Sequence, residues 1–182
     1  MSNKRVVVTG MGVVSPIGNN LDHFWNNLKK GTNGINDISL FDTTNFDVKI
    51  AGESNIDLNS FFDRKELNKL DRFSAFALIA AEQAINQSNI LDCKTSPSRI
   101  GVIVGSGIGG IGTFEAQHKK LLKNPRFVSP FFIPSMISDI AAGQISIKYG
   151  FKGINYSVAS ACATSNHAFG DAYKMIQSGM AD

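Results

Sequence analysis

Cys162 is the residue of this chain best placed for covalent chemistry. It lies in the stretch NYSVASACATSNHAFGDAYKMI, residues 155–176, directly after a predicted strand and at the start of a helix predicted to run from about Cys162 to Gln177. Unpaired backbone N–H groups and the positive end of the helix dipole gather at such a start. Both favour a thiolate, and the same N–H groups can hold an oxyanion when a carbonyl is attacked. Position alone leaves two interpretations open, a nucleophile or a small core hydrophobe.

The other titratable side chains give Cys162 no obvious base. His167 lies five residues further along the helix, about 500° of rotation, so the two side chains point to different faces. We therefore predict a packing or hydrogen-bonding role for His167. His23 and His118 fall in polar helical stretches typical of the surface, and Cys93, in the polar loop LDCKTSPS, is interpreted as incidental.

A glycine-rich loop, GSGIGG at residues 105–110, satisfies the G-x-G-x-x-G pattern of dinucleotide-binding proteins, between a predicted strand and a predicted helix. That pattern also requires an acidic residue about 20 positions further on. The sequence there is NPRFVSPFF, with no carboxylate. We therefore predict no cofactor and assign the glycines to tight turns and close approach of backbones. A nicotinamide-dependent oxidoreductase is the alternative from another enzyme class.

The remaining patterns alternate between strands and helices. Strand patterns lie at residues 5–10, 48–53, 99–105 and 155–160. Helical patterns lie at residues 21–31, 63–88, 112–122, 136–150 and about 162–177, with a loop at 124–135. Strands alternating with helices predict a layered α/β fold with a largely parallel sheet.

Composition narrows the class of protein. The chain has 182 residues, 43% hydrophobic and 18% charged, which suits one globular α/β domain or most of one. A net charge of +3 with dispersed basic residues does not indicate nucleic-acid binding. Two unmatched cysteines predict a reducing, cytoplasmic location. No window reaches transmembrane length, so we expect neither membrane nor metal as a partner.

Five motifs, in order, carry a resemblance to a known family. They are VVVTGMGVVSPIGN, DRKELNKLDRFSAFAL, VGSGIGG, VSPFFIPSMISDIAAGQISIKYG and SACATSNHAFGDA. In this order the chain resembles the β-ketoacyl-acyl-carrier-protein synthases over essentially all of its length. SACATSNHA is the most specific of the motifs. GSGIGG and SPFF are more similar to synthase II than to synthase I.

The resemblance implies a fold and a reaction. The fold is a thiolase-like, layered α/β/α/β/α sandwich of two similar halves. Residues 1–182 would be its N-terminal domain, truncated at its C-terminal end within the first repeat. Cys162 would take an acyl chain from an acyl-carrier-protein thioester. Two histidines, with no matching position in this chain, would help decarboxylate malonyl-carrier protein. The products would be a 3-oxoacyl-carrier protein and CO2, and the 182-residue chain alone is predicted inactive.

The resemblance also implies an acyl pocket shared across a homodimer. Ile108 matches a gating position of the pocket, and Ala161 lies beside the nucleophile. Phe132 matches a residue that reaches the pocket across the dimer interface. For all three residues, the alternative is ordinary core packing.

Three basic residues match positions that dock the acidic acyl carrier protein, in its acyl- and malonyl-loaded forms. Lys65 and Lys69 are one helical turn apart, and Arg126 precedes SPFF. Asn68 stands where the resemblance leads one to expect a further basic residue. The alternative for the three basic residues is a solvated charged face.

Two relatives of the same fold remain as alternatives. One is a ketosynthase of polyketide assembly, which the sequence does not separate from one of fatty-acid synthesis. The other is a non-catalytic subunit of the chain-length-factor type. Such subunits lack the nucleophilic cysteine, so the presence of Cys162 argues against the second alternative.

Overall fold

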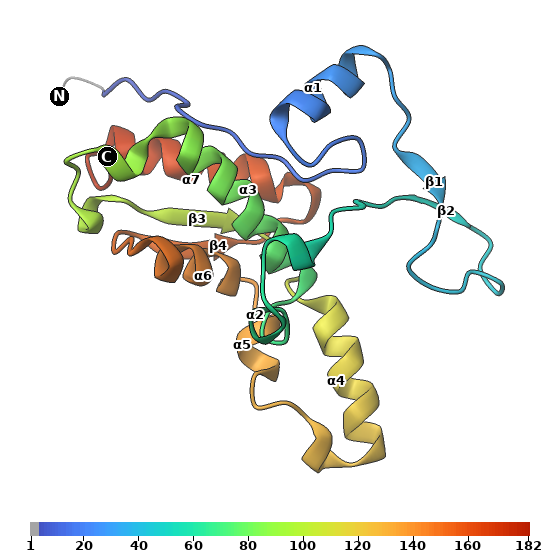
Figure 1. Ribbon diagram of the computed structural model, residues 1–182. Helices are drawn as coiled ribbons and strands as arrows, with labels where there is room; N and C mark the ends of the chain where they lie inside the picture. Colours follow the sequence, from blue (N-terminus) through green and yellow to red (C-terminus); the bar gives the residue numbers. More distant parts are fainter. Residues whose placement is uncertain (1–3) are drawn as a thin grey trace.

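The centre of the fold is a pair of parallel strands, β3 (Val102–Gly105) and β4 (Asn155–Val158). The computed structural model describes residues 4–182. Helix α6 (Ile140–Tyr149) covers one face of the pair and helix α7 (Thr164–Gln177) covers the other, while α3 (Arg72–Ser88) packs along α6 (Figure 1). The predicted α/β layering is confirmed.

Alternation along β3 builds two apolar layers. Val102 and Val104 pack against the core between β3, α3 and α6, whereas Ile103 lines a cavity with Met175 and Ile176 of α7. Successive side chains of a strand point to opposite faces, so one short strand serves both layers. One cluster of buried residues in the core consists of Phe62, Ala75, Leu78, Ile79 and Ile145.

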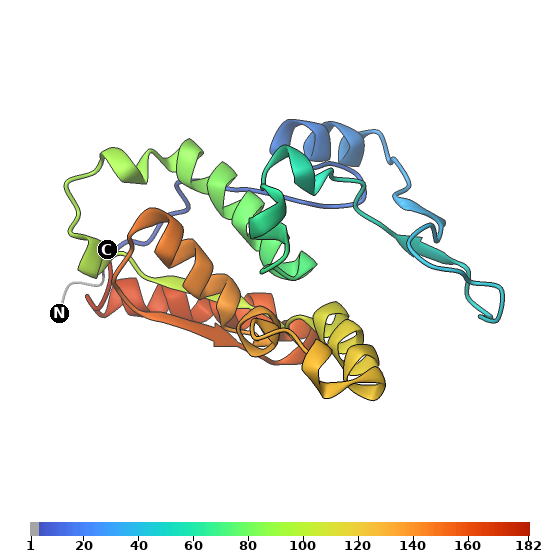
Figure 2. The ribbon, with the colours of Figure 1, turned by 60° about the horizontal axis from the view of Figure 1, so that its bottom comes forward.

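Two arms extend away from the central pair (Figure 2). One contains α4 (Ile111–Lys123), the 3-10 turn η4 (Pro125–Phe127) and α5 (Phe132–Met136). The other contains α1 (Leu21–Lys29) and the strands β1 (Ile35–Asp37) and β2 (Ile50–Gly52). β1 and β2 pair antiparallel, so the predicted parallel arrangement holds only for β3 and β4. The loop predicted at 124–135 contains η4 and the first residues of α5.

The strand predicted at residues 5–10 is wrong. These residues belong to no strand within the described part of the chain, and Val7 and Val8 are 60% and 62% exposed. Just beyond them, side chains of α3 accept the backbone hydrogen bonds. The N–H of Met11 donates to Oε1 of Gln87 at 2.7 Å, and that of Val13 to Oε1 of Gln83 at 3.1 Å. A run of β-branched residues forms a strand only where a neighbouring strand pairs with it.

The single helix predicted over residues 63–88 is also wrong, because Asp71 starts a new one. Helix α2 (Arg64–Leu67) ends early, and α3 begins after Asp71. The Asp71 carboxylate accepts from the N–H of Phe73 at 3.2 Å and from the N–H of Thr113 at 2.8 Å. Gly110, the residue preceding α4, has no side chain to cap that helix. Asp71 therefore caps the starts of two helices, α3 and α4.

We expect Asp71→Ala to destabilise the full-length protein by about 2–3 kcal/mol. Each lost cap is worth about 1 kcal/mol, and Asp71 is only 8% exposed, so the freed N–H groups gain little water. Urea unfolding measures the loss, and hydrogen exchange should quicken in the first turn of α4. Asp63→Ala, which removes the exposed cap of the short α2, is the matched control. An equal loss in both variants would contradict the double cap.

Candidate active site

Cys162 lies in a 3-10 turn, η5 (Ala161–Ala163), between the end of β4 and the start of α7. The predicted strand-to-helix junction is confirmed. Ala161 has a φ of 49°, a left-handed conformation that residues other than glycine and asparagine seldom adopt. This sharp turn leaves the Cys162 side chain exposed in this chain.

The backbone of the turn leaves the N–H of Cys162 itself free beside the sulfur. The N–H of Ala163 donates to the carbonyl of Ser160 at 3.1 Å, and that of Thr164 to the carbonyl of Ala161. The N–H of Cys162 donates to no group within residues 4–182. A free backbone donor next to a nucleophile is suited to hold the oxyanion that forms when a carbonyl is attacked.

His167 supports the turn and does not pair with Cys162. Its Nδ1 lies 2.6 Å from Oγ of Ser160, two residues before the cysteine. The hydrogen-bonding role predicted for His167 is confirmed, and no hydrogen bond joins His167 to Cys162 in the described residues.

Thr164, two residues after Cys162, makes two hydrogen bonds to the turn. Its Oγ1 accepts from the N–H of Ser160 at 2.8 Å and donates to the carbonyl of Ala161 at 2.7 Å. A hydroxyl residue at a predicted helix start is a general capping signal. That signal marks Thr164 as a candidate but does not predict bonds to earlier residues.

The glycine loop, residues 105–110, lies beside the turn η5 that contains Cys162, here called the cysteine turn, at the same edge of the sheet. Gly105 is opposite Val158 in the parallel register, and the N–H of Ser106 donates to the carbonyl of Val158 at 3.1 Å. A side chain at Gly105 would meet Cγ2 of Thr164 at 2.6 Å, so only glycine allows this approach. The carboxyl ends of parallel strands are where α/β folds place their sites.

Hydrogen bonds inside the glycine loop favour the turn-forming role predicted for it. The N–H of Gly109 donates to Oγ of Ser106 at 2.9 Å, and that of Gly110 to the carbonyl of Met136 at 2.8 Å. Gly109 has a φ of 83°, and a side chain there would lie 2.4 Å from the Met136 carbonyl oxygen. These donors are already engaged, whereas a phosphate cradle needs them free.

The three predicted pocket residues lie on segments around this edge. Ile108, 70% exposed, is on the glycine loop, and Ala161 is in the turn that carries Cys162. Phe132 begins α5, where its ring packs against that of Phe114 with centroids 6.3 Å apart. Ile108 and Ala161 thus share the sheet edge of Cys162, and Phe132 is on α5, the helix whose Met136 carbonyl accepts from the glycine loop. Their roles in a pocket stay predictions.

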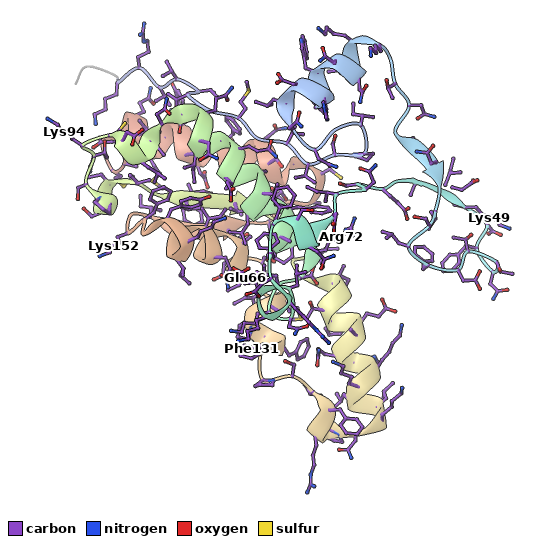
Figure 3. The ribbon with its side chains drawn as sticks, viewed as in Figure 1. Lys49, Glu66, Arg72, Lys94, Phe131 and Lys152 are labelled. Carbon is purple, nitrogen blue, oxygen red and sulfur yellow. The ribbon has the colours of Figure 1, made fainter. Side chains whose placement is uncertain are left out.

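The three predicted docking residues separate into a pair and a single residue. Lys65 and Lys69 are exposed on and just after α2, and the ammonium of Lys69 lies 5.3 Å from the Phe131 ring centroid. Figure 3 labels Glu66 and Phe131 in the region where α2 meets α5. There Oγ of Ser135, on α5, donates to the carbonyl of Lys69, just after α2, at 2.7 Å. Arg126 lies in η4, at the far end of the α4 arm (Figure 1).

A tyrosine joins β4 to α7 close to the cysteine turn. Tyr156 donates to the Asp171 carboxylate at 2.9 Å. Loss of solvent contact, and then this bond to a carboxylate, raise the pKa of Tyr156. The bond holds the strand that leads into the site against the helix that leaves it.

Within residues 4–182, no three His, Cys, Asp or Glu side chains are grouped as a metal ion would require. Over the same residues, no helix combines the length and the apolar character needed to cross a bilayer.

Comparison with known sequences agrees over the whole chain. Residues 3–182 match the family described as Beta-ketoacyl synthase, N-terminal domain. The chain is 47% identical over 182 residues to 3-oxoacyl-[acyl-carrier-protein] synthase 2 of Staphylococcus aureus (strain COL), covering 99% of this chain and 44% of the relative. The enzyme of the same name from Synechocystis sp. is 43% identical over 183 residues, covering 100% of this chain and 44% of the relative. The chain thus spans less than half the length of these relatives.

Solved structures share the fold. The ishigamide ketosynthase/chain length factor matches with a TM-score of 0.84 at 23% identity, covering 100% of this chain and 46% of that one. A complex of a type II polyketide synthase acyl-carrier protein with its ketosynthase, bound to the hexaketide, matches with a TM-score of 0.78 at 26% identity, covering 99% and 49%.

Proposed function

This chain belongs to the β-ketoacyl synthase family, and from that premise we propose that the protein containing it is a 3-oxoacyl-acyl-carrier-protein synthase of the synthase II type. The reaction is a decarboxylative condensation. An acyl chain passes from an acyl-carrier-protein thioester to Cys162. The enolate formed from malonyl-carrier protein then attacks the acyl-cysteine, and CO2 and a 3-oxoacyl-carrier protein two carbons longer are released. The observation that carries the proposal is the position of Cys162 on a sharp strand-to-helix turn, inside the family's most specific motif.

The residues of this chain account for the first half-reaction. The sulfur of Cys162 attacks the thioester carbonyl, and the negative charge develops on the carbonyl oxygen. The unengaged N–H of Cys162 donates to that oxygen. Collapse of the intermediate breaks the bond to the carrier-protein sulfur, which leaves as a thiolate and takes up a proton in place of the one that Cys162 has lost, and the acyl group stays on Cys162. By family resemblance, decarboxylation depends on two histidines, for which this chain has no matching position.

The proposal extends to setting and partners. We place the protein in fatty-acid elongation in the cytoplasm, as a homodimer with residues 1–182 as its N-terminal domain, served by acyl carrier protein. Identity of 47% to a synthase 2 supports fatty-acid elongation over polyketide assembly. The structural similarity to a polyketide ketosynthase makes polyketide assembly the second candidate. The cysteine of the motif argues against a non-catalytic chain-length-factor role.

The direct test supplies the full-length protein with saturated acyl-carrier protein and malonyl-carrier protein. We expect a 3-oxoacyl-carrier protein, detected by mass spectrometry, with release of an equal amount of CO2. Residues 1–182 alone should give neither. Decarboxylation of malonyl-carrier protein without elongation would contradict the proposal. Repeated elongation to a poly-3-oxo chain would favour the polyketide alternative.

A further inference from the structure

We propose that Thr164 is a positioning residue for Cys162, holding the turn in the one conformation that presents the sulfur. This inference rests on the proposed function, because it assigns Thr164 a part in the reaction of Cys162. Oγ1 of Thr164 accepts from the N–H of Ser160 and donates to the carbonyl of Ala161. One bond therefore holds the residue before Ala161, and the other holds the carbonyl of Ala161 itself. Thr164 is only 5% exposed, so water competes little for them.

The turn needs such support because its backbone is strained. Ala161 has a φ of 49°, and the left-handed conformation brings the side chain of an L-residue close to the backbone. Ser160 is also outside the regular regions, with φ −150° and ψ 44°. Strained residues persist only where the surrounding structure determines them. The hydroxyl of Thr164 is the buried group that bonds to both of these residues.

These bonds stabilise the turn and not the helix. A hydroxyl residue that caps a helix precedes it and accepts from an N–H two or three residues later. Thr164 is itself the first residue of α7, and its hydroxyl bonds to groups four and three residues earlier. His167 bonds Ser160 as well, but from an exposed position.

The methyl group of Thr164 has a separate role. It faces Gly105 at the end of β3, where any side chain would lie 2.6 Å from Cγ2. The contact sets the cysteine turn against the glycine loop that carries Ile108. Hydroxyl and methyl can be tested apart, because valine keeps the shape without the hydroxyl and serine keeps the hydroxyl without the methyl.

The test compares Thr164→Val and Thr164→Ser in the full-length protein. The readout is the rate of iodoacetamide alkylation of Cys162 against pH, followed by peptide mass spectrometry, with Cys93 as internal control. We expect Thr164→Val to slow the alkylation of Cys162 near neutral pH by about tenfold, because the thiolate is the species that iodoacetamide attacks, and a displaced turn would move the sulfur away from the backbone N–H groups that favour that form. Thr164→Ser should stay within about twofold of the unmodified protein, and Cys93 should not change.

A double variant tests the reason for the effect. Glycine adopts positive φ without strain, so Ala161→Gly should relieve the need for the two bonds. The slowing caused by Thr164→Val should therefore be smaller in the Ala161→Gly background than in the unmodified protein. An equal slowing in both backgrounds would show that the bonds do not act through residue 161.

Two results would overturn the inference. One is a folded Thr164→Val protein that alkylates Cys162 at the unmodified rate. The other is a Thr164→Ser protein as slow as Thr164→Val, which would assign the effect to the methyl. If Thr164→Val does not fold, Thr164→Ser decides: an unmodified rate supports the hydroxyl role and a tenfold loss refutes it. Should Cys162 of the unmodified protein react no faster than Cys93, the proposed function fails, and the inference with it.

Discussion

Cys162→Ser is expected to reduce condensation by the full-length protein by about a thousandfold or more. The substitution exchanges one sulfur atom for oxygen and leaves the turn nearly the same size. A serine hydroxyl stays protonated near neutral pH unless a base adjoins it. No histidine in the described residues bonds to Cys162, since Nδ1 of His167 is engaged with Ser160. The loss would therefore be chemical and not structural, and the yield of 3-oxoacyl-carrier protein measures it.

Cys93→Ser is the matched control for this experiment. Cys93 is also exposed, but it lies outside the sheet edge, after the 3-10 turn that follows α3. We expect that variant to keep its activity within about twofold, as surface substitutions away from a site usually have small effects. A Cys162→Ser protein with activity near that of Cys93→Ser would place the nucleophile elsewhere.

Reversing the charge of Lys65 and Lys69 together is expected to lower kcat/KM for carrier-protein substrates by about 10- to 100-fold. Both side chains are exposed, Lys65 on α2 and Lys69 just after it, where Lys69 lies over the Phe131 ring. The partner in the proposal is acidic, so glutamates at both positions would turn attraction into repulsion. The effect should shrink as ionic strength rises, because salt screens exposed charges. Steady-state rates at two salt concentrations measure both the loss of kcat/KM and its dependence on ionic strength.

Alkylation of Cys162 by iodoacetamide separates docking from chemistry in this double variant. The reagent is small and uncharged, so its rate should not change. Lys29→Glu with Lys30→Glu, at the exposed end of α1, provides the same charge change at a different place. An equal loss in that control would assign the effect to net charge. An unchanged kcat/KM in the Lys65 and Lys69 variant would remove this surface from docking.

Local sequence patterns predicted the helices and strands that position the site. They failed where contacts between distant segments determine whether a helix or strand forms. β3, α6, β4 and α7 all lie within the ranges predicted for them, and α4 extends one residue beyond its predicted range at each end. The helix predicted over 63–88 is broken because Asp71 also caps α4 through Thr113, 42 residues away. Periodicity along one segment contains no information about such a bond. The strand predicted at residues 5–10 failed for a related reason, since pairing depends on a neighbour.

The site was predictable to a similar degree. The strand-to-helix junction predicted the position of Cys162, and helical geometry predicted that His167 would not pair with it. The left-handed Ala161 and the two bonds of Thr164 were not predicted, because both depend on the path of the backbone between strand and helix. The separation of Arg126 from Lys65 and Lys69 follows from the projecting α4 arm, which the sequence pattern showed only as a helix and a loop.

The most direct test of the central claim is to trap the acyl group on the protein. Full-length protein would be mixed with saturated acyl-carrier protein, without malonyl-carrier protein, then digested and analysed by peptide mass spectrometry. We predict the acyl mass on the peptide that contains Cys162, an equal amount of freed carrier-protein thiol, and loss of the adduct when malonyl-carrier protein is added. An acyl group on Cys93 or another residue, with Cys162 unmodified, would contradict the claim that Cys162 is the nucleophile.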